Sequence, residues 1–426
     1  MNDNIYWIWL SLAATAGSET FKKLISVFGA PKLIYEADDE AISGVVGKRS
    51  RDLAALCDKD LTRAQQIFDF CESKNVGILT YEDAEFPKSL REIDTPPVLL
   101  YYRGILPDFN NACIVSMVGT RRLTGYGRKN AFSIGYDLAK AGAVIASGMA
   151  IGIDGVSHAG SLAAGGVNIA FLGSGIDVCY PEIHQTLARA IVKNGCVMTE
   201  YAPGTRPEGR NFPIRNRLIA GISYCAVVIE GNSKSGSLIT ARYAKEQGKP
   251  VYALPGNVDN KTSEVTNLLI KNGAKLITSA MDIISDVEFV FTGKINPFNV
   301  TERLDISLDE ALSEYKVSAI IPDDKIFSRM FKRGERKTAD KADKKDKNRE
   351  TEETKVIQPV SKEPDDIKFD KDTIAIYKMI PLDGEILIDD LASGEYGMQS
   401  VMKALLKLEM GRFVVMLPGE KVKRNL

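Results

Sequence analysis

The chain has 426 residues, and its 55 Lys and Arg nearly balance its 56 Asp and Glu, which leaves a formal net charge of −1. The length predicts more than one domain, and the composition is that of an ordinary globular protein. The balanced charge excludes attraction of nucleic acid by the chain as a whole, so a nucleic-acid site must come from a local cluster of basic residues.

Residues 1–75 contain short periodic apolar segments separated by glycines, which predicts a small helical domain. The first segment, IYWIWLSLAATAG, ends in small residues as a signal peptide does, but Asp3 precedes it and no Lys or Arg does. We therefore expect an ordinary amphipathic first helix. No apolar segment approaches the length of a membrane span, and we expect no association with membranes.

Residues 76–110 read as a connecting segment, in which two strand-like stretches flank a region rich in prolines and turns. From 111 to 290 the pattern changes, because apolar strands alternate with amphipathic segments of helix length. This alternation predicts an α/β domain with a Rossmann-like, doubly wound and mostly parallel sheet that helices cover on both faces.

Residues 291–370 include a long charged stretch that is almost free of apolar side chains, which predicts a flexible linker. Its lysines and arginines could alternatively touch nucleic acid. Residues 371–426 regain an apolar pattern. Three helix-like segments and a hairpin near Pro418 and Gly419 predict a winged-helix domain.

Little in the sequence points to metal or nucleotide chemistry. The six cysteines are scattered without a C-x-x-C pair, and His158 and His184 are the only histidines, so we expect buried thiols in a reducing cytosol and no metal site. A P-loop motif is absent, and no G-x-G-x-x-G follows the first strand of the α/β region. We therefore expect no cofactor.

Glycine-rich loops follow the strands of the α/β region, where doubly wound sheets bind their ligands. Glycine allows a ligand to approach the backbone, and free N–H groups at a helix start favour anions. The loop GNSKSGS is the strongest candidate, although each loop could also be a simple tight turn. The residues expected to bind phosphate are Gly119, Gly148, Ser235, Gly236 and Ser237.

Arginines gather in two of the crossover loops. Arg121 and Arg122 follow the first strand of the α/β region, and the stretch 210–217, RNFPIRNR, holds three more. Since both loops should meet at one rim, we expect their guanidinium groups to bind several phosphates. Phe212 can stack on an unpaired base, which favours single strands over duplex, or it can anchor its loop in the core. The residues expected to bind nucleic acid are Arg121, Arg122, Arg210, Asn211, Phe212, Arg215, Asn216 and Arg217.

Candidates for catalysis are few. Asp154 and His158 lie one helical turn apart and could form an acid–base pair, or His158 could be a buried, hydrogen-bonded histidine. Glu200 and Glu230 end strands, where acids are often structural. We predict no catalytic residue.

Several segments, in this order along the chain, closely resemble the DNA-processing protein A (DprA/Smf) family. They are VGTRRLTGYG, SGMAIGIDGVSHAGSLAAGG, LGSGIDVCYP, NFPIRNRLIAG, SGSLITARYAKEQGKPVYALPG and NLLIKNGAKLI. The helical N-terminus and the C-terminal region resemble that family's sterile-alpha-motif-like (SAM-like) and winged-helix domains more loosely.

The resemblance implies a cytoplasmic bacterial protein that binds single-stranded DNA and is not an enzyme. It further implies protection of incoming strands during natural transformation (competence), loading of the RecA recombinase in homologous recombination, and a homodimer formed through the Rossmann-like domain. A different interpretation is a nucleotide-processing enzyme similar to the phosphoribohydrolases. The loop GNSKSGSLITA, however, lacks their Gly-Gly pair and glutamate. A third interpretation is a scaffold whose arginines are structural.

Overall fold

The structure, a computed structural model, places the chain in two compact units, Met1–Glu335 and Arg336–Leu426. It describes residues 2–233, 235–301 and 307–317, and in the second unit residues 371–381, 386–392, 396–397, 400–401, 404–405, 407–408, 413–417 and 421–424.

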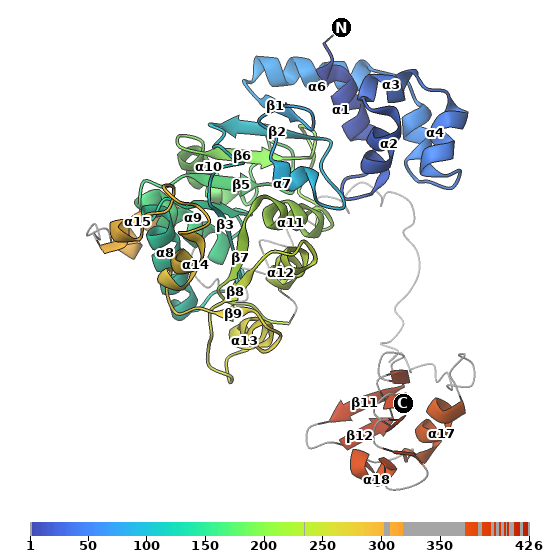
Figure 1. Cartoon of the computed structure of the whole chain (residues 1–426), viewed down its shortest axis with the longest axis vertical. Helices are drawn as coiled ribbons and strands as arrows, with labels where there is room; N and C mark the ends of the chain where they lie inside the picture. Colours follow the sequence, from blue (N-terminus) through green and yellow to red (C-terminus); the bar gives the residue numbers. More distant parts are fainter. Residues whose placement is uncertain are drawn as a thin grey trace, which may run out of the picture. The chain divides into compact units, whose positions relative to one another are not determined.

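The N-terminal region is a cluster of short helices (Figure 1). Their bounds are α1 (Asn4–Ala13), α2 (Thr20–Phe28), α3 (Pro31–Glu36), α4 (Asp39–Val46), α5 (Leu53–Cys57) and α6 (Thr62–Ser73). The apolar stretch at the chain start forms α1 as expected, and its Trp7, Ile8 and Leu10 are buried. A buried carboxylate, Asp52, ties the start of α2 to the start of α5, because the hydroxyl of Thr20 donates to it at 2.5 Å.

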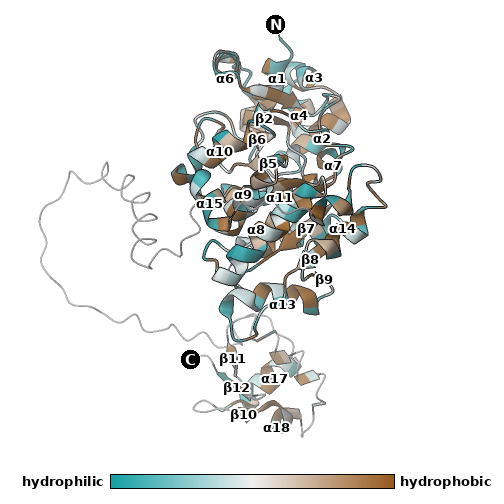
Figure 2. Cartoon of the chain, turned by 90° about the vertical axis from the view of Figure 1, so that its left-hand side faces the viewer, coloured by the Kyte–Doolittle hydropathy of each residue, from teal (hydrophilic) through white to brown (hydrophobic). Residues whose placement is uncertain are grey.

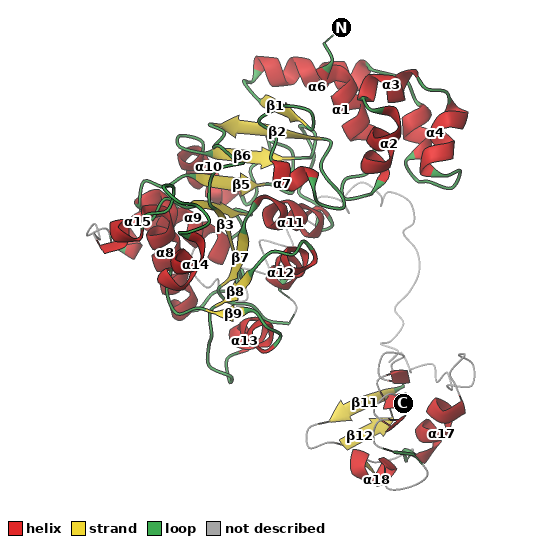
Figure 3. Cartoon of the chain, in the orientation of Figure 1, coloured by secondary structure: helices red, strands yellow, loops and turns green. Residues whose placement is uncertain are grey.

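A nine-stranded sheet forms the centre of the first unit (Figures 1 and 3). Its spatial order is β1-β2-β6-β5-β4-β3-β7-β8-β9. The strand bounds are β1 (Gly77–Thr80), β2 (Leu99–Gly104), β3 (Ile114–Val118), β4 (Val144–Ser147), β5 (Asn168–Phe171), β6 (Cys196–Thr199), β7 (Cys225–Val228), β8 (Val251–Ala253) and β9 (Lys275–Leu276). Strands β3 to β9 pair in parallel, while β1 and β2 are antiparallel. The predicted α/β class with a mostly parallel sheet is therefore confirmed.

The expected connecting segment, 76–110, contributes strands to this sheet. β1 and β2 extend the sheet past β6. The physical reason is the apolar run in β2, because Leu99, Leu100 and Tyr101 are buried and such a run is stable only with both faces covered.

Helices cover both faces of the sheet (Figure 3), which divides the apolar core into two main clusters. One layer holds α8 (Gly125–Lys140), α9 (Ile153–Ala163), α10 (Gln185–Ile191) and α14 (Met281–Val287). The other holds α7 (Lys88–Arg91), α11 (Asn211–Ile222), α12 (Gly236–Glu246) and α13 (Glu264–Lys271). Figure 2 shows apolar residues concentrated along the strands between these layers. None of the helices in the described ranges combines the length and the apolar character needed to cross a membrane.

The winding of the sheet reverses between β3 and β7. From β3 the chain moves outward through β4, β5 and β6, and it then returns to pair β7 with the other side of β3. The loops after β3 and β7 therefore diverge at the carboxyl ends of their strands. Such a reversal opens a crevice, which is the usual ligand site of this architecture.

Part of the expected linker, 291–370, is folded. Residues 308–314 form α15 (Leu308–Glu314), which starts with a capping box between Ser307 and Glu310. Its Ala311 and Leu312 are buried and join the main core. This part of the expected linker therefore folds because it has apolar side chains, which the charged stretch lacks. Residues 318–370, which hold that charged stretch, lie outside the described residues.

The second unit combines short helices with a small sheet. Its elements are α17 (Lys371–Met379), β10 (Ile386–Leu387), α18 (Ile388–Ala392), β11 (Val414–Leu417) and β12 (Lys421–Arg424). The strands are antiparallel in the order β10-β12-β11, and the described residues between 400 and 408 are helical. Arg424 stacks over the ring of Tyr377, with its Cζ 4.4 Å from the centroid. The expected turn at Pro418 and Gly419 lies outside the described residues.

Candidate nucleic-acid interface

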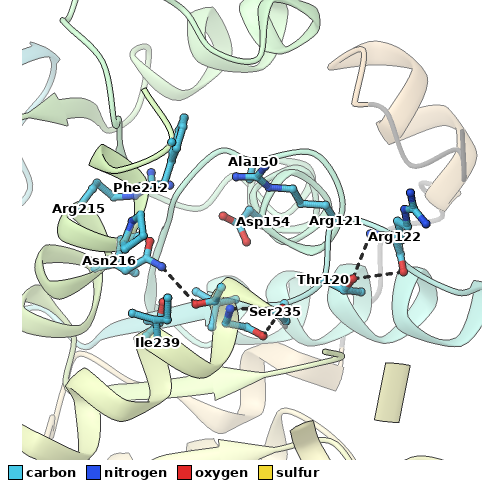
Figure 4. Close-up of a pocket in the computed structure, with 18 of the residues that line it drawn as sticks. Thr120, Arg121, Arg122, Ala150, Asp154, Phe212, Arg215, Asn216, Ser235 and Ile239 are labelled. Atoms are coloured by element: carbon cyan, nitrogen blue, oxygen red, sulfur yellow. Dashed lines mark hydrogen bonds between the residues drawn. The ribbon is translucent and has the colours of Figure 1, made fainter. Parts of the chain in front are cut away.

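A cavity of about 820 Å³ lies where the winding of the sheet reverses. Its lining comes from the loop after β3 and from the first turns of α9, α11 and α12, as Figure 4 shows. The polar and aromatic residues around it include Thr120, Arg121, Arg122, Asp154, Tyr180, Phe212, Arg215, Asn216, Asn232, Ser235 and Ser237. The loop after β3 and the start of α11, which hold the two groups of arginines, thus meet at one edge of the sheet, as predicted.

Arg215 reaches the cavity from α11 and is only 3% exposed. Its Nη1 donates to the carbonyl oxygens of Gly148, at 2.9 Å, and of Phe171. Its Nε has no hydrogen-bond partner in the described part of the chain. Burial lowers the pKa of Arg215 to about 10, so the guanidinium stays charged near neutral pH. A buried charge of this kind favours an anion beside it.

Gly148 leaves room for the Arg215 guanidinium beside the backbone. A Cβ at this position would lie 2.5 Å from Arg215 Nη2, so only glycine lets the guanidinium approach the backbone. The N–H of Gly148 already donates to Asp154 Oδ2, at 3.2 Å. This geometry differs from the sequence expectation, in which the Gly148 amide was a phosphate ligand.

Phe212 lies between two guanidinium groups. The Cζ of Arg121 is 5.5 Å from its ring centroid, and the Cζ of Arg215 is 5.9 Å away. The ring of Tyr180 packs beside it at 5.4 Å between centroids. Phe212 is half-buried and lines the cavity, so it both anchors the start of α11 and offers an aromatic surface to a ligand.

The loop after β3 carries Arg121 and Arg122 to the rim of the cavity. Its path is fixed by close packing, since a Cβ on Gly119 would lie 2.5 Å from a side-chain carbon of α9. Glu230, at the end of β7, accepts hydrogen bonds from the N–H of Thr124 at 3.0 Å and from its hydroxyl at 2.6 Å. The strand-end acid Glu230 is therefore an anchor for this loop.

The N-terminus of α12 faces the cavity. Ser235 caps the helix by accepting a hydrogen bond from the N–H of Ser237, and Ser235, Gly236 and Ser237 all line the cavity. Asn216 bridges to this turn, because its Nδ2 donates to the carbonyl of Gly236 at 3.3 Å. The unsatisfied N–H groups of a helix start carry partial positive charge. Lys234, in the same loop, lies outside the described residues.

Three of the expected nucleic-acid ligands do not line the cavity. Arg217 is 3% exposed, and its Nη2 donates to the buried carboxylate of Glu200 at 2.5 Å. Burial raises the pKa of Glu200, while the charge of Arg217 opposes that rise. Asn211 is also buried and donates its Nδ2 to a backbone carbonyl at 3.1 Å. Arg210 lies on the surface, paired with Glu208 at 2.7 Å.

Asp154 and His158 do not form the acid–base pair that the sequence left open, because each has a different hydrogen-bond partner. His158 is fully buried, and its Nδ1 lies 2.9 Å from Asn168 Oδ1, while Asp154 turns into the cavity. Burial lowers the pKa of His158 to about 4, so the ring is neutral near pH 7. His158 is thus a core residue that helps to fasten α9 to β5.

Among the cavity residues that sequence reasoning missed are Tyr180 and Asp154. Tyr180 follows the third strand of the α/β region, inside a segment read only as a glycine loop. Asp154 was considered only as a partner of His158, yet it faces the arginines (Figure 4). The available signal was its place in the first turn of α9, which starts at the same edge of the sheet as the other loops.

Comparison with known proteins places these features in one family. A family model described as DNA recombination-mediator protein A matches residues 77–288. Protein Smf of Synechocystis is 34% identical over 290 residues, which cover 67% of this chain and 73% of that protein. The chain belongs to the DNA recombination-mediator protein A family. The resemblance to DprA/Smf proteins is therefore confirmed.

Other members of the family agree with this assignment. The DNA processing protein DprA of Streptococcus pneumoniae is 40% identical over 204 residues, which span 48% of this chain and 72% of that protein. The X-ray structure of DprA from the same organism superposes with a TM-score of 0.57 at 33% identity. The match covers 67% of this chain and 98% of that one, so the DprA fold extends over most of the first unit.

Proposed function

We propose that this family member binds single-stranded DNA in the cavity at the reversal of the sheet, as a recombination mediator. The observation that carries the proposal is the ring of Phe212, held between the guanidinium groups of Arg121 and Arg215. Guanidinium groups bind phosphates, and an aromatic ring stacks on a base. Membership in a family of DNA-processing proteins supports a recombination-related role on DNA.

Each cavity residue has a separate part in this proposal. Arg121 and Arg215 bind backbone phosphates, and Arg122 adds a contact at the exposed rim. The start of α12, with Ser235 to Ser237, receives a further phosphate through its N–H groups. Phe212 stacks on a base that is not paired, and this requirement selects single strands.

Asn211 and Arg217 take no direct part. Both are buried, with Asn211 Nδ2 and Arg217 Nη2 hydrogen-bonded inside the fold, and they shape α11, which carries the binding residues. Arg210, on the surface, strengthens the binding of DNA through its charge.

The wider cellular role extends this proposal. We propose that the protein is cytoplasmic, acts as a homodimer without catalysis, protects incoming strands during natural transformation and helps to load RecA. The helices at 4–73 support a SAM-like N-terminal domain, and the helices and antiparallel sheet of the second unit support a winged helix.

A titration of the full chain with fluorescent oligonucleotides tests the central claim. We expect the protein to bind single-stranded DNA more tightly than duplex of the same length, and to release it as salt rises. Phe212→Ala should weaken single-strand binding by about 1–3 kcal/mol, the usual contribution of one stacked base, with a smaller effect on duplex. Equal affinity for both forms of DNA, or equal losses on both, would argue against the proposal.

A further inference from the structure

A single buried carboxylate shares the cavity with the arginines. Asp154 stands in the first turn of α9, is 8% exposed and lines the cavity. In Figure 4 it lies between the side chains of Arg121 and Arg215. A carboxylate is an unfavourable neighbour for a DNA phosphate, so its place among phosphate-binding groups needs an explanation.

Asp154 is not needed to orient Arg215. Two backbone carbonyls, of Gly148 and Phe171, already hold the Nη1 of Arg215. The carboxylate instead accepts the N–H of Gly148 and interacts with the arginines mainly through its charge. Its effect on Arg121 and Arg215 is therefore electrostatic, like that of a phosphate placed near them.

The other titratable groups near Asp154 are neutral. Burial lowers the pKa of both His158, on the same helix, and His184, which packs against Gly155. Burial also raises the pKa of Tyr201, which faces Arg215. In its ionised form Asp154 then interacts with the charges of Arg215 and Arg121.

We propose that Asp154 is a built-in competitor of the DNA phosphates, which neutralises Arg121 and Arg215 in the free protein and so limits the affinity for single strands. The inference rests on the proposed function and adds a determinant of its strength. When a strand binds, its phosphates must share the arginines with a carboxylate that cannot leave. Dissociation is thereby kept easy, which suits a protein that must hand its strand on.

Protonation of Asp154 would remove this competition. Burial raises the pKa of Asp154, and the nearby Arg215 and Arg121 only partly oppose the rise. As the pH falls through that pKa, the carboxylate loses its charge, and affinity for a phosphate chain increases. By linkage, a bound strand raises the pKa further, because it stabilises the neutral acid.

The test compares Asp154→Asn with the wild-type full chain in a titration with labelled oligothymidylate, whose bases do not titrate in mild acid. Asparagine keeps an oxygen acceptor for the Gly148 N–H but carries no charge. At a pH where Asp154 is ionised, the variant should bind about tenfold more tightly, which is the order expected for removing one charge a few ångströms from a phosphate. Damage to the fold alone would weaken binding.

Glu200→Gln is the matched control, since Glu200 is a second buried carboxylate that interacts with an arginine, through an ion pair with Arg217, but it lies outside the cavity. This control should not tighten binding. Wild-type affinity should also rise as the pH falls through the raised pKa of Asp154, and this rise should shrink in Asp154→Asn.

Unchanged or weaker binding by a folded Asp154→Asn variant overturns the inference while leaving the proposed function intact. If Asp154→Asn does not fold, the inference is tested with Asp154→Ser and with the pH dependence of wild-type binding. A wild-type affinity for single strands that does not change with pH rejects the inference. If the wild type binds no single strand at all, the proposed function fails and the inference fails with it.

Discussion

Arg215 and Arg217 are two residues apart and have different surroundings. Positions two apart on an α-helix point about 200° away from each other. Arg215 thus shares the cavity side of α11 with Phe212, Asn216 and Ile219, whereas Arg217 faces Glu200 on the other side. The spacing of the arginines, and not their number, decides which of them can reach DNA.

Alanine substitutions at these two positions should separate binding from stability. Arg215→Ala should lose most single-strand affinity, because it removes a cavity cation, and should keep a cooperative unfolding transition. Arg217→Ala should cost about 3 kcal/mol of unfolding free energy, since it leaves Glu200 buried without its partner. Melting curves and titrations on both variants provide the measurement. The reverse pattern would make Arg217 the DNA contact.

Helix α11 is the element that carries the site, and contacts along its length hold it in place. Near its start, Gly17, in the loop between α1 and α2, packs so closely that a Cβ there would lie 2.8 Å from Ile214 Cγ2. At its end, Lys249 donates its Nζ to the carbonyls of Ala220, Gly221 and Ser223. A cation at a helix C-terminus satisfies carbonyls that have no partner within the helix.

Removal of the Lys249 side chain that caps the C-terminus of α11 should destabilise this helix without changing the residues that line the cavity. Lys249→Met keeps the length of the side chain but leaves three carbonyls without their donor, at a cost of about 2 kcal/mol in unfolding free energy. Chemical denaturation measures the loss. Lys245→Met, on the exposed side of α12, is the control and should change stability little. An equal effect of both substitutions would contradict a capping role for Lys249.

At the scale of the whole molecule, a chain with a net charge of −1 places Arg121, Arg122 and Arg215 around one crevice. Arg121 and Arg215 are far apart in the sequence, but the parallel topology brings both to the carboxyl edge of the sheet. We therefore expect the attraction of DNA to be local. It should depend on few phosphate contacts and not on a broad basic surface.

The salt dependence of binding tests this local attraction. Each phosphate contact on a single strand contributes about −0.7 to the slope of log affinity against log salt, so contacts from Arg121, Arg122 and Arg215 predict a slope of roughly −2. Titrations at several salt concentrations give the slope, and Arg121→Ala should flatten it by about one contact. A far steeper slope would mean that other basic parts of the chain bind the strand.

The sequence by itself determined the α/β class, the parallel strands and the loops that carry the site, because these depend on local periodicity and on the carboxyl-edge rule for parallel sheets. It also brought Arg121, Phe212 and Arg215 together correctly. It could not separate Arg215 from Arg217, or find Asp154 among the arginines. Those facts depend on how α9 and α11 are rotated against the sheet, and packing between distant segments decides that rotation. For the same reason the sequence predicts only a connecting segment where β1 and β2 lie. Their place beside β6 is a long-range pairing that no local pattern encodes.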